Sequence, residues 1–396
     1  MKNNIYIVHS EEALVFRDGR PFGNDAQVHG GLLRWPHPGT VLGMFRSRIG
    51  LSRDMNFFTG EKRKQNIEQI KKIGMLRMIP MWQSERAEVW KPLFPAPADV
   101  IITEAKEQSE HKSFSLHPLH YESPRNGEGV NLPWSNWLLP ISTVREKPAK
   151  EAPDLWYWGP FKRWLEEGSF SQSLTDKELG TDWPVEEFRL HTAVNNDTGT
   201  VLEGQLFSSR GIRLGVKSGK DQLPGRYGIG VELTGMEEDD SPQGSYFLGG
   251  DRKIAHIESV AELLPPCPSF ITPSRYLRLI LVTAGNFASW APSWLHPDDG
   301  GREIAWKTLP GSDIDLRLVS ASLPRWQAVS GWDMETRGPK ATARLVPAGS
   351  VYLIELKDPQ QAPELAAKLW GKNIAMTETA DGYGCICIGK QSIEGE

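Results

Sequence analysis

The feature that most constrains this chain is its supply of turn residues. Thirty-eight glycines and 29 prolines are scattered through 396 residues. Glycine adopts backbone conformations that other residues avoid, and proline lacks the backbone N–H donor, so both interrupt helices and strands. The sequence therefore predicts many short elements joined by turns and irregular loops, with few strong helices.

The elements that can be read from the sequence are of mixed type. Near the N-terminus, residues 5–8 and 13–16 read as strands. A helix is expected to begin with Thr40 as its N-cap and to carry one apolar stripe, formed by Val41, Leu42, Phe45 and Ile49. A short helix is also expected at about residues 161–167. Near the C-terminus the expected order is two strands, a helix and a strand, at residues 276–283, 350–356, 363–370 and 385–388.

This order predicts an α+β fold. A strand, a helix, a glycine-rich turn and a strand form the closing half of a ferredoxin-like βαββαβ unit, and the opening strand, turn and helix suit the first half of another. The chain length favours two domains. We therefore expect two ferredoxin-like (RRM-related) domains with long inserted loops. The first spans residues 1–235, with an irregular insertion at about 104–185, and the second spans residues 236–396 and carries the glycine-rich loop.

Cysteine usage and hydropathy indicate the compartment. Three cysteines are too few for a disulfide framework, and they lack the paired spacing of a structural zinc site. The N-terminus turns acidic where a signal peptide would be apolar, and no long uncharged apolar run appears. We expect a cytoplasmic protein without membrane contact, and we predict neither a metal nor another cofactor.

The charge is low overall but unevenly distributed. A net charge of −5 gives no whole-chain signature of a nucleic-acid binder. Residues 1–72, however, hold 12 Lys and Arg against 7 Asp and Glu, whereas the remainder holds 33 against 43. A localised basic segment therefore precedes an acidic remainder.

Two glycine-rich turns are candidates for binding an anion. One lies just before the last expected strand, where paired glycines let backbone N–H groups approach a phosphate. The other is a Gly-Gly-Asp turn followed by two cations, so that backbone donors and charges could meet one anion. An ordinary turn is the alternative in both places. The residues concerned are Gly382, Tyr383 and Gly384 in the first turn, and Arg252 and Lys253 in the second.

Other candidate residues give weaker signals. His37 lies between two prolines ahead of the basic helix, where it could serve acid–base chemistry, but no partner is readable nearby, which favours a structural or stacking role. The 15 tryptophans could be stacking platforms, yet basic residues are not consistently interleaved with them, which favours core anchors. Motifs for nucleotide phosphate binding, dinucleotide binding, serine hydrolysis and zinc proteolysis are absent, so nothing requires catalysis.

Several blocks in order along the chain resemble the third subunit of the Cmr complex, a RAMP-superfamily protein of type III-B CRISPR effectors. The resemblance extends from residue 15 to 389, nearly the whole chain, and RDGRPF and PAGSVY are its most specific parts. The blocks are VFRDGRPF at 15–22, HPGTVLG at 37–43, FPAPADV at 94–100, HTAVNNDTGTVLEGQLF at 191–207, GGDR at 249–252, GWD at 331–333 and PAGSVY at 347–352.

The resemblance implies a fold, a function and partners. The fold is a pair of ferredoxin-like, RRM-related domains. The function is that of a non-catalytic subunit that binds the 5′ tag of the CRISPR RNA and caps the guide-bearing backbone. The implied partners are the large polymerase-like subunit and the first backbone RAMP subunit. The family's C-terminal glycine-rich loop falls on residues 382–389, which contain no Lys or Arg, so RNA contacts there would use backbone N–H groups or the Tyr383 ring. Packing is the alternative role.

Single-stranded RNA is held by localised cations together with stacking and hydroxyl contacts. Asn195 could read a base edge, although Asn-Asn-Asp-Thr-Gly is also an ordinary turn, which we favour. Two other functions stay open: a metal-independent CRISPR RNA-processing endoribonuclease that uses His37, and a structural adaptor without direct RNA contact. The predicted RNA-binding residues are Arg17, Arg20, His37, Arg46, Arg48, His191, Asn195, Arg252, Lys253, Gly382, Tyr383 and Gly384, and no catalytic residue or metal ligand is predicted.

Overall fold

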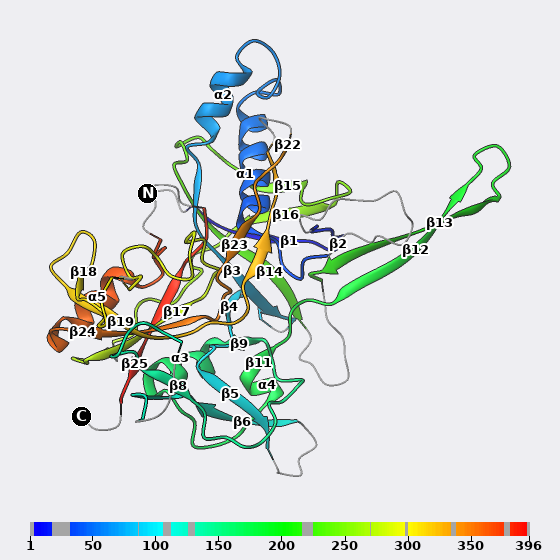
Figure 1. The fold of residues 1–396 in the computed structure, drawn as a ribbon. Coiled ribbons are helices and arrows are strands. Elements are labelled where there is room, and N and C mark those ends of the chain that lie inside the picture. The colour runs from blue at the N-terminus through cyan, green and yellow to red at the C-terminus, as the bar shows by residue number, and fades with distance from the viewer. Residues whose placement is uncertain are drawn as a thin grey trace.

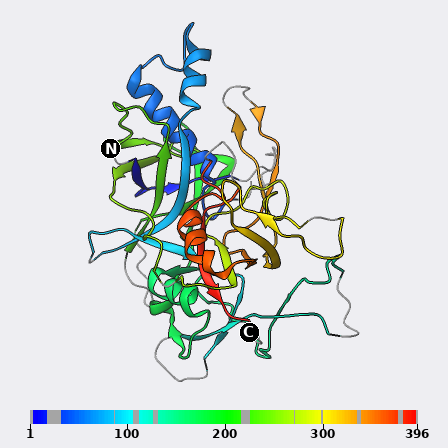
Figure 2. The same cartoon turned by 90° about the vertical axis from the view of Figure 1, so that its left-hand side faces the viewer.

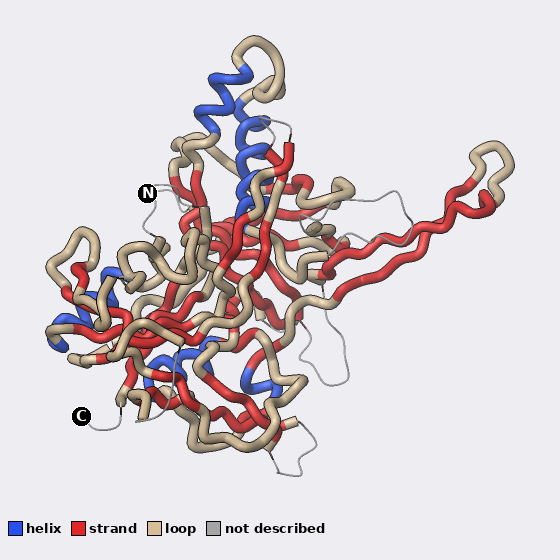
Figure 3. Tube along the Cα trace, in the orientation of Figure 1, coloured by secondary structure: helices blue, strands red, loops and turns tan. Residues whose placement is uncertain are grey.

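Two antiparallel sheets form the centre of the molecule, and long excursions leave them (Figures 1 and 3). Short strands and loops dominate the chain trace, as the glycine and proline content predicts. The computed structural model describes residues 4–17, 32–85, 87–105, 112–125, 131–215, 225–269, 271–297, 300–333, 338–375 and 381–393.

The larger sheet has eight strands and holds the N-terminal strand near one end. Apolar residues alternate along this strand: Tyr6 and Val8 face one side and Ile7 the other, and all three are buried. Both faces of the sheet are therefore covered. In spatial order the strands are β11 (Gly180–Thr181), β9 (Leu155–Tyr157), β4 (Lys91–Pro95), β3 (Gly74–Ser84), β14 (Gly225–Thr234), β1 (Ile5–His9), β16 (Ile254–Ser259) and β15 (Gly244–Phe247).

Helix α1 (Pro38–Arg53) packs on one face of this sheet through the apolar stripe that its sequence predicts. Its buried residues include Val41, Leu42, Phe45 and Ile49. The predicted start at Thr40 is wrong, because His37 is the N-cap and Pro38 is the first helical residue. Proline suits this position because its φ is already helical and the first N–H has no partner within the helix. The charged stretch that follows forms α2 (Arg63–Ile70), which is mostly exposed.

The smaller sheet has five strands and contains the C-terminal elements that the sequence predicts. Helix α5 (Ala362–Leu369), preceded by the short 3₁₀ helix η1 (Pro359–Gln361), packs on one face. A two-stranded ribbon of β7 (His120–Glu122) and β8 (Leu139–Ile141) covers the other, where Tyr121 contacts Leu353. The strands in order are β18 (Lys307–Thr308), β19 (Asp315–Ser322), β24 (Val351–Leu356), β17 (Tyr276–Leu281) and β25 (Ile386–Gln391).

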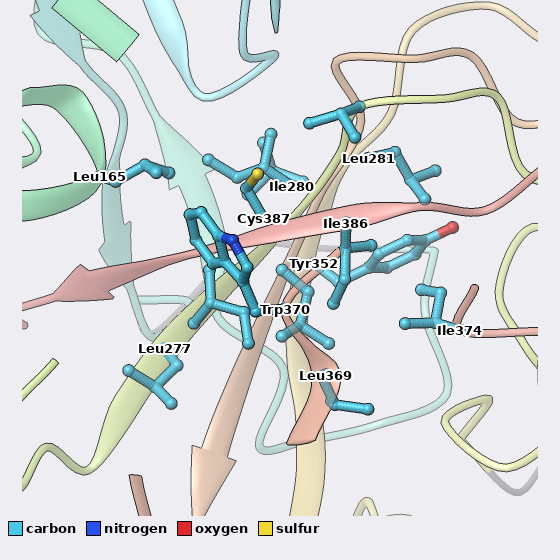
Figure 4. Close-up of a cluster of buried hydrophobic side chains, with 14 of the residues drawn as sticks. Leu165, Leu277, Ile280, Leu281, Tyr352, Leu369, Trp370, Ile374, Ile386 and Cys387 are labelled. Carbon is cyan, nitrogen blue, oxygen red and sulfur yellow. The ribbon is translucent and has the colours of Figure 1, made fainter. Parts of the chain in front are cut away.

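One hydrophobic core joins the two sheets. Ile7 and Ile79 of the larger sheet belong to the same buried cluster as the strands of the smaller one. Figure 4 shows side chains from α3, α5, β17, β24 and β25 meeting in this cluster. Trp134, Trp137 and Trp156 are buried in it, as expected for core anchors.

A long insertion separates β3 from β14 along the chain, although the two strands are neighbours in the larger sheet. The region near residues 104–185 contains short strands and the helix that the sequence predicts near residue 161. Its additional elements are β5 (Val100–Glu104), β6 (Ser113–Pro118), β10 (Leu174–Thr175), α3 (Trp158–Glu167) and α4 (Asp176–Leu179).

Two hairpin arms project from this body. The first arm, β12 (Glu186–Val194) and β13 (Val201–Arg213), extends far to one side in Figure 1 and is anchored by pairing with β2 (Ala13–Leu14). The second arm stands apart from α1 in Figure 2, in orange. It consists of β20 (Gln327–Val329), β21 (Trp332–Asp333), β22 (Gly338–Pro339) and β23 (Ala343–Leu345).

None of the helices in the described residues combines the length and the apolar character that crossing a membrane requires.

Candidate functional site

The C-terminal glycine turn lies against the start of α1, although the two are far apart in the sequence. Asp381 forms a parallel bridge with Met75 at the start of β3. A Cβ atom on Gly382 would lie 2.7 Å from the Met75 sulfur and 3.0 Å from Pro38 Cβ. Gly382 and Gly384 both have positive φ, 78° and 69°, a region that favours glycine. Packing against α1 and β3 therefore explains this turn at least in part, which is the alternative role that the sequence left open.

Among the described residues, nothing covers the N-terminus of α1 beside this turn. Gly39 and Thr40 are exposed, and a Cβ atom on Gly39 would meet no heavy atom of the described residues within 4 Å. The first turn contains no acidic residue and His37 makes no side-chain capping hydrogen bond. The first N–H groups of a helix have no carbonyl partner within it, and the helix dipole adds positive potential there. This end of α1 is therefore suited to an anion such as a phosphate.

His37 is partly buried at this end of α1. Burial lowers its pKa from the ordinary value near 6.5 to about 4, so the ring is neutral at pH 7. Its Nε2 atom is buried, and no described residue forms a hydrogen bond with it. The ring is neutral and partly exposed, which suits a stacking contact.

Tyr383 and Arg46 border the same junction but are engaged within the chain. Burial raises the pKa of Tyr383 to about 12, and Asp381 adds to the shift. Arg46 donates from Nε and Nη2 to the Ile73 carbonyl, at 2.9 and 2.7 Å, and from Nη2 to the Lys71 carbonyl at 3.0 Å. These bonds tie α1 to the end of α2 and the start of β3, which favours a structural role for Arg46.

Arg48 faces the opposite edge of α1. Its Nη2 donates to the Gln243 carbonyl at 3.2 Å, next to β15, whereas its buried Nε has no hydrogen-bond partner among the described residues. It thus fixes α1 to the edge of the larger sheet.

The second glycine-rich turn docks on the first strand region. Gly250 N donates to the Val15 carbonyl at 2.8 Å, and Arg17 forms an ion pair with Asp251 at 3.4 Å. Asp251 and Arg252 have positive φ, and the Leu248 N–H closes the turn on the Lys253 carbonyl at 2.9 Å. The structure therefore brings Arg17, Arg252 and Lys253 together. Arg20 lies outside the described residues.

His191 and Asn195 lie on the first arm, away from both turns. His191 Nε2 is 2.7 Å from Ser209 Oγ on the paired strand. Asn195 Oδ1 accepts from the N–H groups of Asp197 and Thr198, at 2.9 and 3.3 Å, at the tip. The prediction of an ordinary turn at this asparagine is confirmed.

The predicted residues that the structure describes thus fall in four separate places: the junction of α1 with the glycine turn, the opposite edge of α1, the Arg17 turn and the first arm. Gly382 lies against Met75 and against Pro38, the residue that follows His37. Sequence reasoning singled out neither Pro38 nor Met75. The sequence signal for the exposed start of α1 is the pair of glycines in the HPGTVLG block. A Cβ atom on either glycine would meet no heavy atom of the described residues within 4 Å. Among the described residues, no three His, Cys, Asp or Glu side chains gather closely enough to hold a metal ion.

Comparisons with known proteins give a family. The chain matches the family described as CRISPR-associated protein (Cas_Cmr3) over residues 8–391. No curated protein matches the sequence.

Two solved structures illustrate the similarity. One is a chain of the cryo-EM structure of the type III-B Cmr-beta bound to cognate target RNA and AMPPnP, state 1. It is 14% identical, the match covers 88% of this chain and 86% of that chain, and the TM-score is 0.39. A chain of the crystal structure of the Csm3-Csm4 subcomplex in the type III-A CRISPR-Cas interference complex is 11% identical, over 88% and 92% of the two chains, with a TM-score of 0.28. The family match over residues 8–391, nearly the whole sequence, shows that this chain belongs to the Cas_Cmr3 family of CRISPR-associated proteins, the family of a type III-B Cmr complex subunit in antiviral defence.

Proposed function

We propose that this chain is the non-catalytic subunit that binds the 5′ tag of the CRISPR RNA in a type III-B effector complex. The observation that carries the proposal is the exposed N-terminus of α1, whose first turn contains no acidic residue and which borders the glycine turn at Gly382. A tag phosphate would be bound by N–H groups of the first turn. The neutral His37 ring would contact the adjoining nucleotide.

We further propose how the subunit is built and placed. In the larger sheet β16, β1, β14 and β3 lie side by side in this order, and in the smaller sheet β25, β17, β24 and β19 do so. In each set, the strand that comes fourth along the chain lies beside the first, followed by the third and then the second, as in a ferredoxin-like unit. Each unit would have one irregular connection in place of a helix. The boundary after residue 235 stays a prediction, and the pairing of β16 with β1 favours a boundary after Ser259. The subunit would cap the backbone, in contact with the large polymerase-like subunit and the first backbone RAMP subunit.

Substitution of Gly39 tests the tag site. Gly39→Glu places a carboxylate at the helix N-terminus, where it favours the helix but repels a phosphate. We expect the tag affinity of the reconstituted complex to fall by about tenfold or more, which corresponds to about 1.4 kcal/mol. The thermal stability of the chain should stay the same or rise.

Gly39→Gln is the matched control, because it has nearly the same size without the charge. Its effect on tag affinity should be clearly smaller than that of Gly39→Glu. Equal affinities for wild-type and Gly39→Glu complexes would exclude a phosphate at this helix end.

A structural adaptor is the second candidate, since Arg17, Arg46 and Asn195 all have partners within the chain. Photo-crosslinking separates the two functions. With 4-thiouridine placed along the tag of the assembled complex, a crosslink to the peptide that contains His37 supports tag binding. Crosslinks to neighbouring subunits alone would favour the adaptor.

A further inference from the structure

The two arms of the molecule differ in charge and in exposed side chains. Residues 185–213 of the first arm hold three Arg and four Asp or Glu. All three cations form ion pairs inside that arm, with Glu186 or Glu187. Residues 323–346, which include the second arm, hold four Lys or Arg and two Asp or Glu. The second arm is therefore cationic and the first is not.

One face of the second arm combines a tryptophan with an arginine. Ala328 of β20 lies opposite Arg344 of β23, and Trp326 precedes Ala328 by two residues, so the three share a face of the hairpin. The Arg344 guanidinium lies over the Trp326 ring, 4.8 Å from its centroid. Trp326 remains 49% exposed. The indole is thus held by a cation and is still accessible.

Further cations lie along the arm without acidic partners. Arg325, Lys340 and Arg344 are all exposed, and none of them forms an ion pair within the described part of the chain. Ala328, Ala341 and Thr342 are exposed near them. The described part of this surface is thus positive and carries an accessible aromatic ring.

We propose that this face of the second arm binds single-stranded RNA, with a base stacked on Trp326, neighbouring phosphates held by Arg344 and Lys340, and a further phosphate held by Arg325 at the edge of the face. Single strands are bound by such a combination, because an unpaired base exposes its face and the flanking phosphates attract the cations. A base-paired duplex has its base faces stacked against neighbouring base pairs and cannot present them in this way.

A protein partner fits this surface less well. Tryptophan and arginine are also common in protein interfaces, but the centre of such an interface is depleted of charge and rich in apolar side chains. That description suits the first arm, where Phe188, Leu190 and Leu206 are 52–66% exposed. The second arm instead offers the exposed Trp326 ring beside cations that form no ion pair with any described residue.

The test is the affinity of the full-length chain for a fluorescent oligouridine of roughly 12 nucleotides, measured by anisotropy over a series of salt concentrations. Trp326→Ala should weaken binding by about fivefold to a hundredfold with little change in salt dependence, and Trp326→Phe should retain most of the affinity. Arg344→Gln and Lys340→Gln should each lower the slope of log affinity against log salt by about 0.7.

Trp306 provides a matched control. Arg317 lies over its ring at 4.5 Å, as Arg344 does over Trp326, but Arg317 is paired with Glu355 at 2.6 Å. Trp306→Ala should therefore leave RNA affinity unchanged. Unchanged affinity in Trp326→Ala, or equal losses in Trp326→Ala and Trp306→Ala, would overturn the proposal. A Trp326→Ala chain that binds RNA normally but fails to enter the complex would overturn it in favour of a protein interface.

Guide and target RNA offer the same chemistry to this face. In the assembled complex, 4-thiouridine placed in one strand at a time identifies which strand crosslinks to the peptide spanning residues 325–345. The site is separate from α1, so the outcome for Trp326 is independent of the outcome for Gly39→Glu.

Discussion

His37 shows how far a residue's surroundings in the fold can go beyond its sequence context. For this histidine between two prolines, the sequence favours a structural or stacking role over acid–base chemistry. In the fold it is the N-cap of α1, with a buried Nε2 and a pKa lowered by burial to about 4. Burial of the ring in the fold causes this shift, and charged neighbours do not.

The lowered pKa predicts a pH dependence of stability. In the unfolded chain His37 takes up a proton near pH 6.5, whereas in the folded chain it does so only near pH 4. The contribution of the neutral ring is therefore fully present above pH 6.5. It is lost as the pH falls toward 4, by about 1.4 kcal/mol per pH unit.

Chemical denaturation of wild-type and His37→Gln chains between pH 4.5 and 7.5 measures this. We expect the wild-type chain to lose stability relative to the variant as the pH falls below 6.5. Parallel pH profiles for the two chains would contradict the assignment.

At the scale of elements, a buried ion pair joins the insertion to the smaller sheet. Arg278 of β17 and Asp99, just before β5, are 1% and 2% exposed and lie 2.8 Å apart. Asp99 also accepts from Trp164 Nε1 of α3 at 2.9 Å, and Arg278 donates to the Trp164 carbonyl. The nearby Ala98 N–H donates to the Gly349 carbonyl at 2.8 Å. Two blocks distant in the sequence, FPAPADV and PAGSVY, are thus in contact.

Asp99→Ala should destabilise the fold strongly, because it leaves the Arg278 charge buried and unpaired. We expect a loss of about 3–5 kcal/mol in the free energy of unfolding, measured by denaturant titration. The double variant Asp99→Leu with Arg278→Met should recover much of that loss, since no buried charge remains.

The exposed pair of Arg163 and Glu167 on α3 is the control for this prediction. Arg163→Ala should cost less than about 1 kcal/mol. Similar losses for Asp99→Ala and Arg163→Ala would show that burial does not determine the cost.

For the whole molecule, the distribution of charge predicts a composite RNA site. The net charge is −5, and the candidate contacts lie at the junction of α1 with the glycine turn, at the Arg17 turn and on the two arms. An acidic chain with dispersed cations attracts RNA weakly, because the electrostatic contribution grows with the number of phosphates contacted together.

Isolated chain should therefore bind tag RNA at least about tenfold more weakly than the assembled complex near physiological salt. Fluorescence anisotropy with labelled tag RNA measures both affinities, and a complex assembled without this chain is the control. Equal affinity of the isolated chain and the complete complex would contradict a composite site.

The sequence by itself determined the mixed fold class, the C-terminal elements, the apolar stripe of α1 and the family blocks. These depend on local properties: side-chain periodicity, turn chemistry and short motifs. The start of α1 was missed by three residues, because Pro38 and Thr40 both give start signals and only the helix packing selects between them.

Tertiary structure alone decided which candidates meet. In the fold, Gly382 lies against Pro38 and Met75, and Arg46 donates hydrogen bonds to backbone carbonyls. The Asn195 side chain accepts hydrogen bonds within its own turn, whereas the Trp326 ring stays exposed beside Arg344. The reason is physical: whether a cation or a ring is available to a ligand depends on what else lies within a few ångströms. In a fold dominated by pairing between distant strands, those neighbours come from elsewhere in the chain.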